Sequence, residues 1–234
     1  MDEKFAGLFA WLKRASFVAA IASLGFLGGG CSGIPTEQNP VTPQEVTFEP
    51  SEVGKPPGGF TTGLTGGGGP VSWMVRLLPQ APNHKPVLVQ ESSDDTSYRF
   101  PLCIYEKLLA RDVAVEVKFQ AISGKVDQAG GIVLRYTPEN YYIARANALE
   151  DNINLFKTVR GKRTKIKEVP FKVSAGQWHT LRFEAKDRRL TVVFDGRAVI
   201  QTTDSSFLNP GRIGLWTKAD SVSAFTDLRI EPAR

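Results

Sequence analysis

The chain has 234 residues, only two cysteines and two histidines, and a formal net charge of +5. Neither His84 nor His179 lies near a cysteine, which excludes a zinc site with paired Cys and His ligands. The net charge falls to +4 once the net +1 of residues 1–30 is removed. Because this excess is mild and the basic residues are not interleaved with aromatics, no nucleic-acid partner is expected.

Residues 1–30 are predicted to be a signal peptide. A basic pair precedes an apolar run of about 13 residues, Ala15 to Leu27, which matches a secretory h-region and is too short to span a bilayer. The segment before Cys31 resembles the lipobox of bacterial lipoproteins, although Gly28 stands where Leu is usual. Two interpretations stay open: Cys31 carries a lipid, or the chain is simply secreted and Cys31 remains a thiol or pairs with Cys103.

The remaining chain divides into a tether and one domain. Residues 31–44 contain Cys31 and a segment rich in Pro, Thr, Gln and Asn, which has too little apolar surface to fold. Residues 45–232 are long enough for one all-β domain with a single core, in which Cys103 is expected to be a buried, inert thiol. We therefore expect an exported, lipid-anchored protein of the bacterial cell envelope, facing the periplasm or the outer surface.

Period-two alternation dominates the domain, and helical patterns are almost absent. Val113, Val115 and Val117 alternate with smaller or charged residues, and a turn at Asp187-Arg188-Arg189 joins two further alternating runs. About a dozen strands of this kind predict an antiparallel sandwich of two sheets. Further strands are expected at Val71–Leu78, Pro86–Glu91, Ile153–Val159, Ala198–Thr203, Arg212–Thr217 and Val222–Glu231.

The positive charge gathers around Gly161. We interpret this run as a solvated hairpin tip, with a site for an acidic polymer as the alternative. The basic residues are Lys157, Arg160, Lys162, Arg163, Lys165 and Lys167.

A hairpin is predicted where Ile132–Tyr136 and Tyr141–Ala146 flank the four residues Thr137 to Asn140. Because side chains alternate along a strand, one face then carries Tyr141, Ile143, Arg145 and Asn147, and the other carries Tyr142, Ala144 and Ala146. A face bearing Tyr, Arg and Asn suits sugar hydroxyls.

Arg145 is the notable residue of this face, because a charged group in mid-strand needs water, an ionic partner or a ligand. A ligand contact and an ion pair with Glu150 or Asp127 are both open. The group Glu150-Asp151-Asn152 either forms the turn before Ile153 or binds a structural calcium. Gly130-Gly131 precedes no helix, so it is not a phosphate loop and instead permits a bulge or close sheet packing.

Several separated motifs occur together in a recognisable order. They are Asp127 to Gly131, Tyr141-Tyr142, Arg145 to Asn147, Glu150 to Asn152, Gly176 to His179, Phe194 to Gly196 and Gly214 to Ser221. With these motifs, the sequence over Thr47 to Ile230 resembles the 3-keto-disaccharide hydrolase domain family. The resemblance implies a concanavalin-like and laminin-G-like jelly-roll β-sandwich whose concave sheet binds carbohydrate, with cleavage of 3-keto-glycosides by some members.

A 3-keto sugar has an acidic hydrogen on C2, so its glycosidic group can leave by elimination before water adds. This chemistry requires a base in reach of that proton and donors aimed at the developing enolate oxygen. The predicted catalytic residues are Glu150 and His179 as bases, with Asp151 as a further candidate base, and Arg145 and Lys218 as stabilisers. The predicted substrate-binding residues are Asp127, Gln128, Tyr141, Asn147, Asn152 and Trp216.

Purely structural roles are also open for two of these residues: a structural hydrogen bond for His179 and core packing for Trp216. Ordinary double-displacement hydrolysis is not expected, because the adjacent Glu150 and Asp151 would point to opposite faces of a strand. No cofactor is expected beyond the possible calcium. The alternatives to an enzyme are a non-catalytic glycan-binding or adhesion module and a structural lipoprotein that binds another protein. The expected partners are carbohydrate and a membrane, the latter through the lipid.

Overall fold

The computed structural model describes residues 40–234, which form fifteen β-strands and two short 3-10 helices, η1 (Pro50–Glu52) and η2 (Pro82–His84). The predicted signal peptide, the lipidation site Cys31 and most of the predicted tether lie outside these residues. None of the described helices is long and apolar enough to cross a bilayer.

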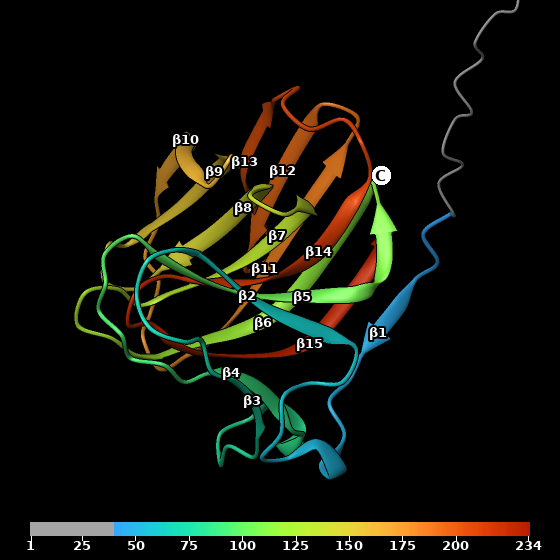
Figure 1. Ribbon diagram of the computed structural model, residues 1–234. Helices are drawn as coiled ribbons and strands as arrows, with labels where there is room; N and C mark the ends of the chain where they lie inside the picture. Colours follow the sequence, from blue (N-terminus) through green and yellow to red (C-terminus); the bar gives the residue numbers. More distant parts are fainter. Residues whose placement is uncertain (1–39) are drawn as a thin grey trace, which may run out of the picture. The chain divides into compact units, whose positions relative to one another are not determined.

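The strands form two antiparallel sheets (Figure 1). In the eight-stranded sheet the order is β13-β12-β11-β6-β15-β4-β3, and β1 pairs with β15. Its strands are β1 (Gln44–Val46), β3 (Trp73–Arg76), β4 (Val87–Gln90), β6 (Val113–Ser123), β11 (Trp178–Lys186), β12 (Arg189–Phe194), β13 (Arg197–Thr203) and β15 (Val222–Pro232).

In the seven-stranded sheet the order is β10-β9-β8-β7-β14-β5-β2, so β10 and β2 are its edges. Its strands are β2 (Phe60–Gly66), β5 (Arg99–Ala110), β7 (Ala129–Thr137), β8 (Asn140–Asn147), β9 (Asn152–Val159), β10 (Lys162–Pro170) and β14 (Gly211–Thr217).

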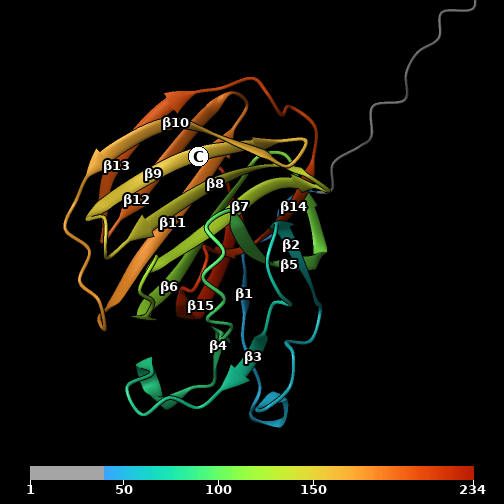
Figure 2. The ribbon, with the colours of Figure 1, turned by 60° about the vertical axis from the view of Figure 1, so that its left-hand side comes forward.

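The two sheets stack face to face, with β9, β8 and β7 crossing in front of β12, β11 and β6 in Figure 2. Apolar residues of both sheets, such as Val115, Phe183 and Leu215, fill the space between them and are fully buried. This arrangement confirms the predicted two-sheet antiparallel jelly-roll sandwich. Cys103 is a free thiol in this core, where burial raises its pKa above the ordinary value.

Strand β8 divides its side chains between two buried surfaces, as its alternation predicts. Tyr142, Ala144 and Ala146 belong to the core between the sheets. Tyr141 and Ile143 belong to a separate apolar cluster made only by strands of the seven-stranded sheet, so they lie on its other side. We call that side the outer face.

Glycines in β7 let neighbouring groups approach closely on both sides of the sheet. A Cβ on Gly130 would lie 2.6 Å from the Phe119 ring in the core. On the outer face, a Cβ on Gly131 would lie 2.8 Å from the Ala144 carbonyl oxygen and 3.3 Å from the Trp216 ring. The two glycines therefore serve close packing, as the sequence indicates.

Two strands of the seven-stranded sheet were not expected. Phe60–Gly66 forms β2 although it contains glycines, which are disfavoured in strands, because it pairs along its whole length with β5. The basic run is not only a hairpin tip: Lys162–Pro170 forms β10, which pairs with β9 through a bulge between Lys165 and Lys167. Hydrogen bonding to a neighbouring strand thus stabilises strands that the local sequence does not predict.

Replacing Gly130 with Ala is expected to lower the free energy of unfolding by about 1–3 kcal/mol, because the new methyl group meets the Phe119 ring in a packed core. The measurement is urea unfolding. Gly67→Ala is the matched control, since its methyl group would make only an ordinary contact of 3.7 Å with Thr96 and should change stability by less than about 0.5 kcal/mol. Equal effects in the two variants would contradict the close packing at Gly130.

Candidate functional site

The turn that follows β8 is built by Asn147. Its side-chain oxygen accepts hydrogen bonds from the backbone N–H groups of Leu149 at 2.8 Å and Glu150 at 3.2 Å, a common way for Asn to stabilise a turn. Its amide nitrogen donates to the carboxylate of Asp127. Asn147 is fully buried, and both of its polar atoms have partners in the protein. Its role is therefore to form the turn that presents Glu150.

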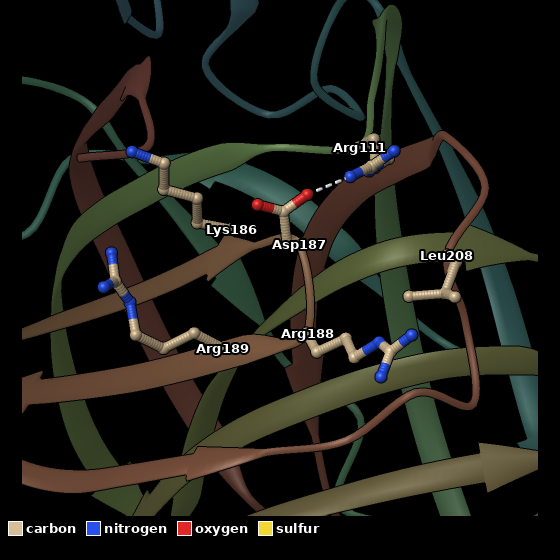
Figure 3. A pocket seen from close by; sticks show the side chains of 6 residues that line it. All are labelled: Arg111, Lys186, Asp187, Arg188, Arg189 and Leu208. Atoms are coloured by element: carbon tan, nitrogen blue, oxygen red, sulfur yellow. Dashed lines mark hydrogen bonds and ion pairs between the residues drawn. The ribbon is translucent and has the colours of Figure 1, made fainter.

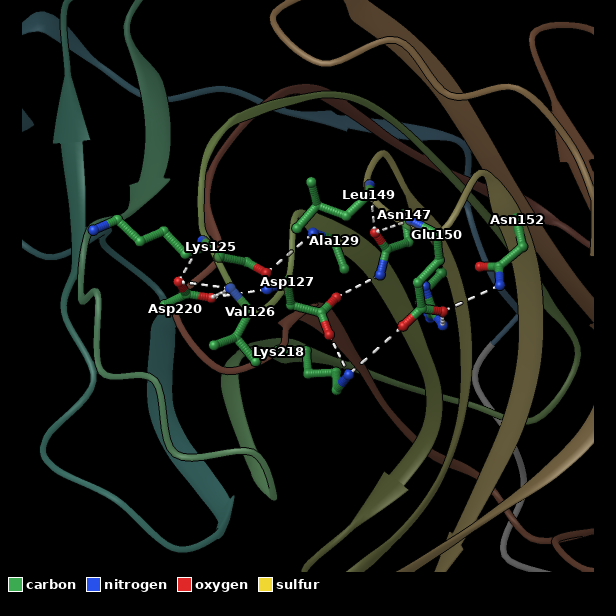
Figure 4. Close-up of polar contacts among 12 residues, drawn as sticks. Lys125, Val126, Asp127, Ala129, Asn147, Leu149, Glu150, Asn152, Lys218 and Asp220 are labelled. Carbon is green, nitrogen blue, oxygen red and sulfur yellow. Dashed lines mark hydrogen bonds and ion pairs between the residues drawn. The ribbon is translucent and has the colours of Figure 1, made fainter.

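Charged side chains from three segments meet beside this turn (Figure 4). Arg145 Nη2 donates to Glu150 Oε2 at 2.6 Å, and Lys218 Nζ lies 3.7 Å from Glu150 Oε1. Lys218 also forms an ion pair with Asp127, and the Asn152 amide donates to Glu150 Oε2 at 3.1 Å. We call Asp127, Arg145, Asn147, Glu150, Asn152 and Lys218 the charged cluster.

Two carboxylates of the charged cluster have pKa values displaced in opposite directions. Burial raises the pKa of Asp127, and the hydrogen bond and charge of Lys218 offset only part of this. Burial would also raise the pKa of Glu150, but Arg145, Asn152 and Lys218 together outweigh it and lower the value. Glu150 is therefore ionised at neutral pH and is a weak base.

Asp220 fixes the loop that carries Asp127. Its carboxylate accepts hydrogen bonds from the backbone N–H groups of Lys125, Val126 and Asp127, at 2.5 to 3.1 Å. Burial acts to raise the pKa of Asp220, but these three donors lower it overall. The turn between β14 and β15 thereby holds the loop between β6 and β7, and both contribute a member of the charged cluster.

Arg145 leaves more of its guanidinium without a hydrogen-bond partner than the buried Arg135 and Arg99 do, although Nε of Arg99 also lacks one. Arg135 donates to the carbonyls of Arg111 and Phe207, and Arg99 donates to the carbonyls of Ala219 and Pro70. Arg145 is only 3% exposed, yet its Nε and Nη1 have no hydrogen-bond partner among the described residues. A buried donor without an acceptor is costly, so these two N–H groups are suited to a ligand.

Aromatic side chains lie on the outer face next to Arg145. Trp216 and Phe100 stack with their ring centres 5.5 Å apart, and both are fully buried. The guanidinium of Arg163 lies 4.3 Å from the centre of the Phe100 ring and 4.4 Å from that of Phe156. Trp216 thus packs outside the inter-sheet core, as the alternation with Leu215 predicts, but the protein's own arginine covers the rings.

Three more predicted residues lie outside the charged cluster. Tyr141 shares the outer face, but it is buried and its hydroxyl donates to Thr65 Oγ1 at 2.8 Å. The Gln128 amide donates to the Gly124 carbonyl at 3.0 Å. Asp151 lies in the turn and accepts from Lys172 Nζ at 2.9 Å, which with the Val173 N–H lowers its pKa.

His179 does not join the other predicted catalytic residues. It belongs to β11 in the eight-stranded sheet, where its ring stacks on Phe194 at a centroid distance of 5.1 Å. Its Nδ1 lies 2.8 Å from the Asp195 carboxylate, and its Nε2 contacts the backbone of Ser174. The structural hydrogen bond expected as the alternative for His179 is therefore what the fold provides.

Among the described residues a cavity lies beside the charged cluster, and no group of side chains resembles a metal site. In residues 40–234 no three His, Cys, Asp or Glu side chains gather as metal ligands do. A cavity of about 620 Å³ lies at the β11–β12 turn, and none of the predicted site residues lines it (Figure 3). A second, of about 340 Å³, lies beside the charged cluster and is lined by Val126, Asp220 and neighbouring residues.

Sequence patterns alone missed three residues of this region. Asp220 lay inside a motif but was assigned no role. Asn154 lies opposite Arg145 in the β8–β9 ladder, and Arg163 lies opposite Thr158 in the β9–β10 ladder. Antiparallel pairing of β8 with β9 across the turn places Asn154 on the same face as Arg145, but the position of Arg163 required knowledge that β10 pairs with β9.

Comparisons with solved structures agree with the fold. The carbohydrate-binding module CBM66 from Bacillus subtilis superposes with a TM-score of 0.58 at 23% identity, over 74% of this chain and 95% of that module. The carbohydrate recognition domain of Emp46p gives 0.52 at 12% identity, over 75% and 89%. A galectin-like protein of unknown function from Bacillus subtilis gives 0.50 at 13%, over 74% and 90%. These likenesses support the jelly-roll fold.

No family model and no curated protein matches the sequence. The resemblance to 3-keto-disaccharide hydrolases therefore stays a resemblance.

Lys218→Met is expected to lower the free energy of unfolding by about 3 kcal/mol, because it leaves the buried Asp127 carboxylate without its counter-charge. Urea unfolding at pH 7 measures this. The double variant Asp127→Asn with Lys218→Met removes both charges and should lose less than the sum of the two single variants. Strict additivity would show that Lys218 and Asp127 do not form a coupled pair.

Proposed function

We propose that this domain binds carbohydrate on the outer face of the seven-stranded sheet, at the charged cluster. The observation that carries the proposal is the buried Arg145 guanidinium, whose Nε and Nη1 have no partner among the described residues. Sugar hydroxyls accept hydrogen bonds from fixed donors of this kind. The fold supports the same assignment, because CBM66 is a carbohydrate-binding module and the Emp46p domain is a carbohydrate recognition domain.

The exposed part of the cluster supplies complementary groups. The Glu150 side chain is 40% exposed and can accept from hydroxyls, while Lys218, 17% exposed, can donate. Leu149 and Val126 are exposed apolar side chains in the two loops that flank the cluster, and they suit the C–H surface of a sugar ring. Donors, an acceptor and apolar contacts thus occur within one small area.

Binding accounts for Glu150 better than catalysis does. A general base works best when its pKa lies near the working pH, whereas the environment of Glu150 lowers its pKa. His179, the other main candidate base, lies in the opposite sheet. The cluster is therefore equipped to hold a ligand and poorly equipped to remove a carbon-bound proton.

Glycan-array screening followed by calorimetry tests the proposal. Glu150→Gln keeps the shape of the side chain but removes its charge, and it should weaken glycan affinity by about tenfold or more. Glu139→Gln is the matched control, because Glu139 is an exposed glutamate at the opposite end of β8. Absence of any bound glycan, or equal affinity of both variants with the parent, would contradict the proposal.

Glycan affinity is expected to stay constant from pH 8 to pH 5. The pKa of the Glu150 carboxylate lies below its ordinary value, so the group stays ionised over this range and loses its charge only in more acidic solution. Calorimetric titrations at four pH values check this. A loss of affinity between pH 7 and pH 5 would assign the binding to a different titrating group.

Cleavage of 3-keto-glycosides is the second candidate, favoured by the single observation that Arg145 and Lys218 flank a partly exposed carboxylate. Incubation of the purified protein with 3-keto-disaccharides and their unoxidised parents decides between the two. Release of monosaccharide from the oxidised sugars alone would establish turnover. Measurable glycan affinity with no product would leave the domain as a binding module.

We further propose that the domain is exported and anchored through lipid on Cys31, on the strength of the amino-terminal sequence pattern. Mass spectrometry of the membrane fraction should detect the lipid on Cys31. An unmodified residue at this position would reject the anchor without affecting the glycan proposal.

A further inference from the structure

Two arginines lie over the same aromatic ring on the outer face. The guanidinium carbon of Arg145 lies 5.6 Å from the centre of the Phe156 ring, and that of Arg163 lies 4.4 Å from it. Strand β9 carries Phe156 and lies between β8, which carries Arg145, and β10, which carries Arg163. Burial lowers the pKa of Arg163, and the positive charge of Arg145 lowers it further. The two like charges therefore repel each other.

The surrounding carboxylates leave Arg163 without a partner. Glu150 pairs with Arg145, and Asp127 pairs with Lys218. Glu168 also faces this side and pairs with Lys165. Four cations thus face three carboxylates, and among the described residues the guanidinium of Arg163 makes no ion pair and no hydrogen bond. A negative group is missing from the region between the two arginines.

Buried polar atoms around the ring also lack partners. Besides Nε and Nη1 of Arg145, these are Nη1 of Arg163 and both amide atoms of Asn154, which is fully buried. Lys165 and, to a smaller extent, the Asn154 amide lower the pKa of Glu168, but no hydrogen bond joins that carboxylate to Asn154. Several unsatisfied groups so close together mark a place for a polar ligand.

We propose that the glycan bound by this domain is an acidic saccharide, and that its carboxylate binds between Arg145 and Arg163. The inference rests on the proposed function and names the ligand class. A carboxylate is planar and matches the parallel N–H pairs of a guanidinium, and one negative charge balances the excess of one positive charge. Among the described residues the Arg163 guanidinium lies over the Phe100 and Phe156 rings without an anionic partner, and the carboxylate of the saccharide would supply one.

The test compares oligosaccharides that differ only in charge. Uronic-acid oligosaccharides, their methyl esters and the corresponding neutral oligosaccharides are titrated into the protein, together with the variants Arg163→Gln, Arg163→Lys and Lys162→Gln. Lys162 is the matched control, because it precedes Arg163 on β10 and is exposed, and side chains alternate along a strand. Urea unfolding of each variant verifies that it is folded.

The parent protein should bind an acid at least about tenfold more tightly than its ester, the usual scale for a charge-assisted hydrogen bond. Arg163→Gln should abolish this preference while keeping the affinity for the ester, Arg163→Lys should restore part of it, and Lys162→Gln should retain it. Equal affinity for acid and ester, or an unchanged preference in Arg163→Gln, would overturn the inference while leaving glycan binding in place. Binding of no saccharide at all would overturn both proposals.

Discussion

Every residue of β8 must face either the space between the sheets or the outer face of its own sheet, and this alternation determines where the polar groups lie. Tyr142 and Ala144 serve the core, which obliges Arg145 to leave it. An arginine on that outer face is tolerated because Glu150, which the next turn positions, accepts a hydrogen bond from its Nη2. The position of the charged cluster thus follows from how the sandwich packs.

The cluster contains two kinds of polar residue that sequence inspection does not separate. Asn147 and Asp127 are fully buried and satisfied by the protein, so they build the turn and its support. Arg145 has donors without a partner, and Glu150 and Lys218 are partly exposed. Ion pairs hold all three in position. Such a division is typical of a binding surface, in which rigid interior groups orient a few outer ones toward the ligand.

The fold was predictable because alternating apolar residues and turn signals record the inward faces of both sheets. The β7–β8 hairpin followed from the same alternation, whereas the sequence left open a ligand contact of Arg145 and an ion pair with Glu150 or Asp127, and the structure shows the pair with Glu150. Strands β2 and β10 were not predicted, since the glycines of β2 and the lysines of β10 are disfavoured in strands, and pairing with β5 and β9 orders these segments. The position of Arg163 on the outer face and the location of His179 in the other sheet depend on which strands pair. A single sequence does not reveal this pairing.

The basic composition of β10 has a consequence for solubility. This strand is an edge of its sheet, so one row of its backbone hydrogen-bonding groups is open to pairing with another chain. Lys162, Lys165 and Lys167 line this edge, and like charges keep two such edges apart. Chemical acetylation of these lysines would remove the repulsion, and the protein would then be prone to assemble into extended sheets across neighbouring molecules.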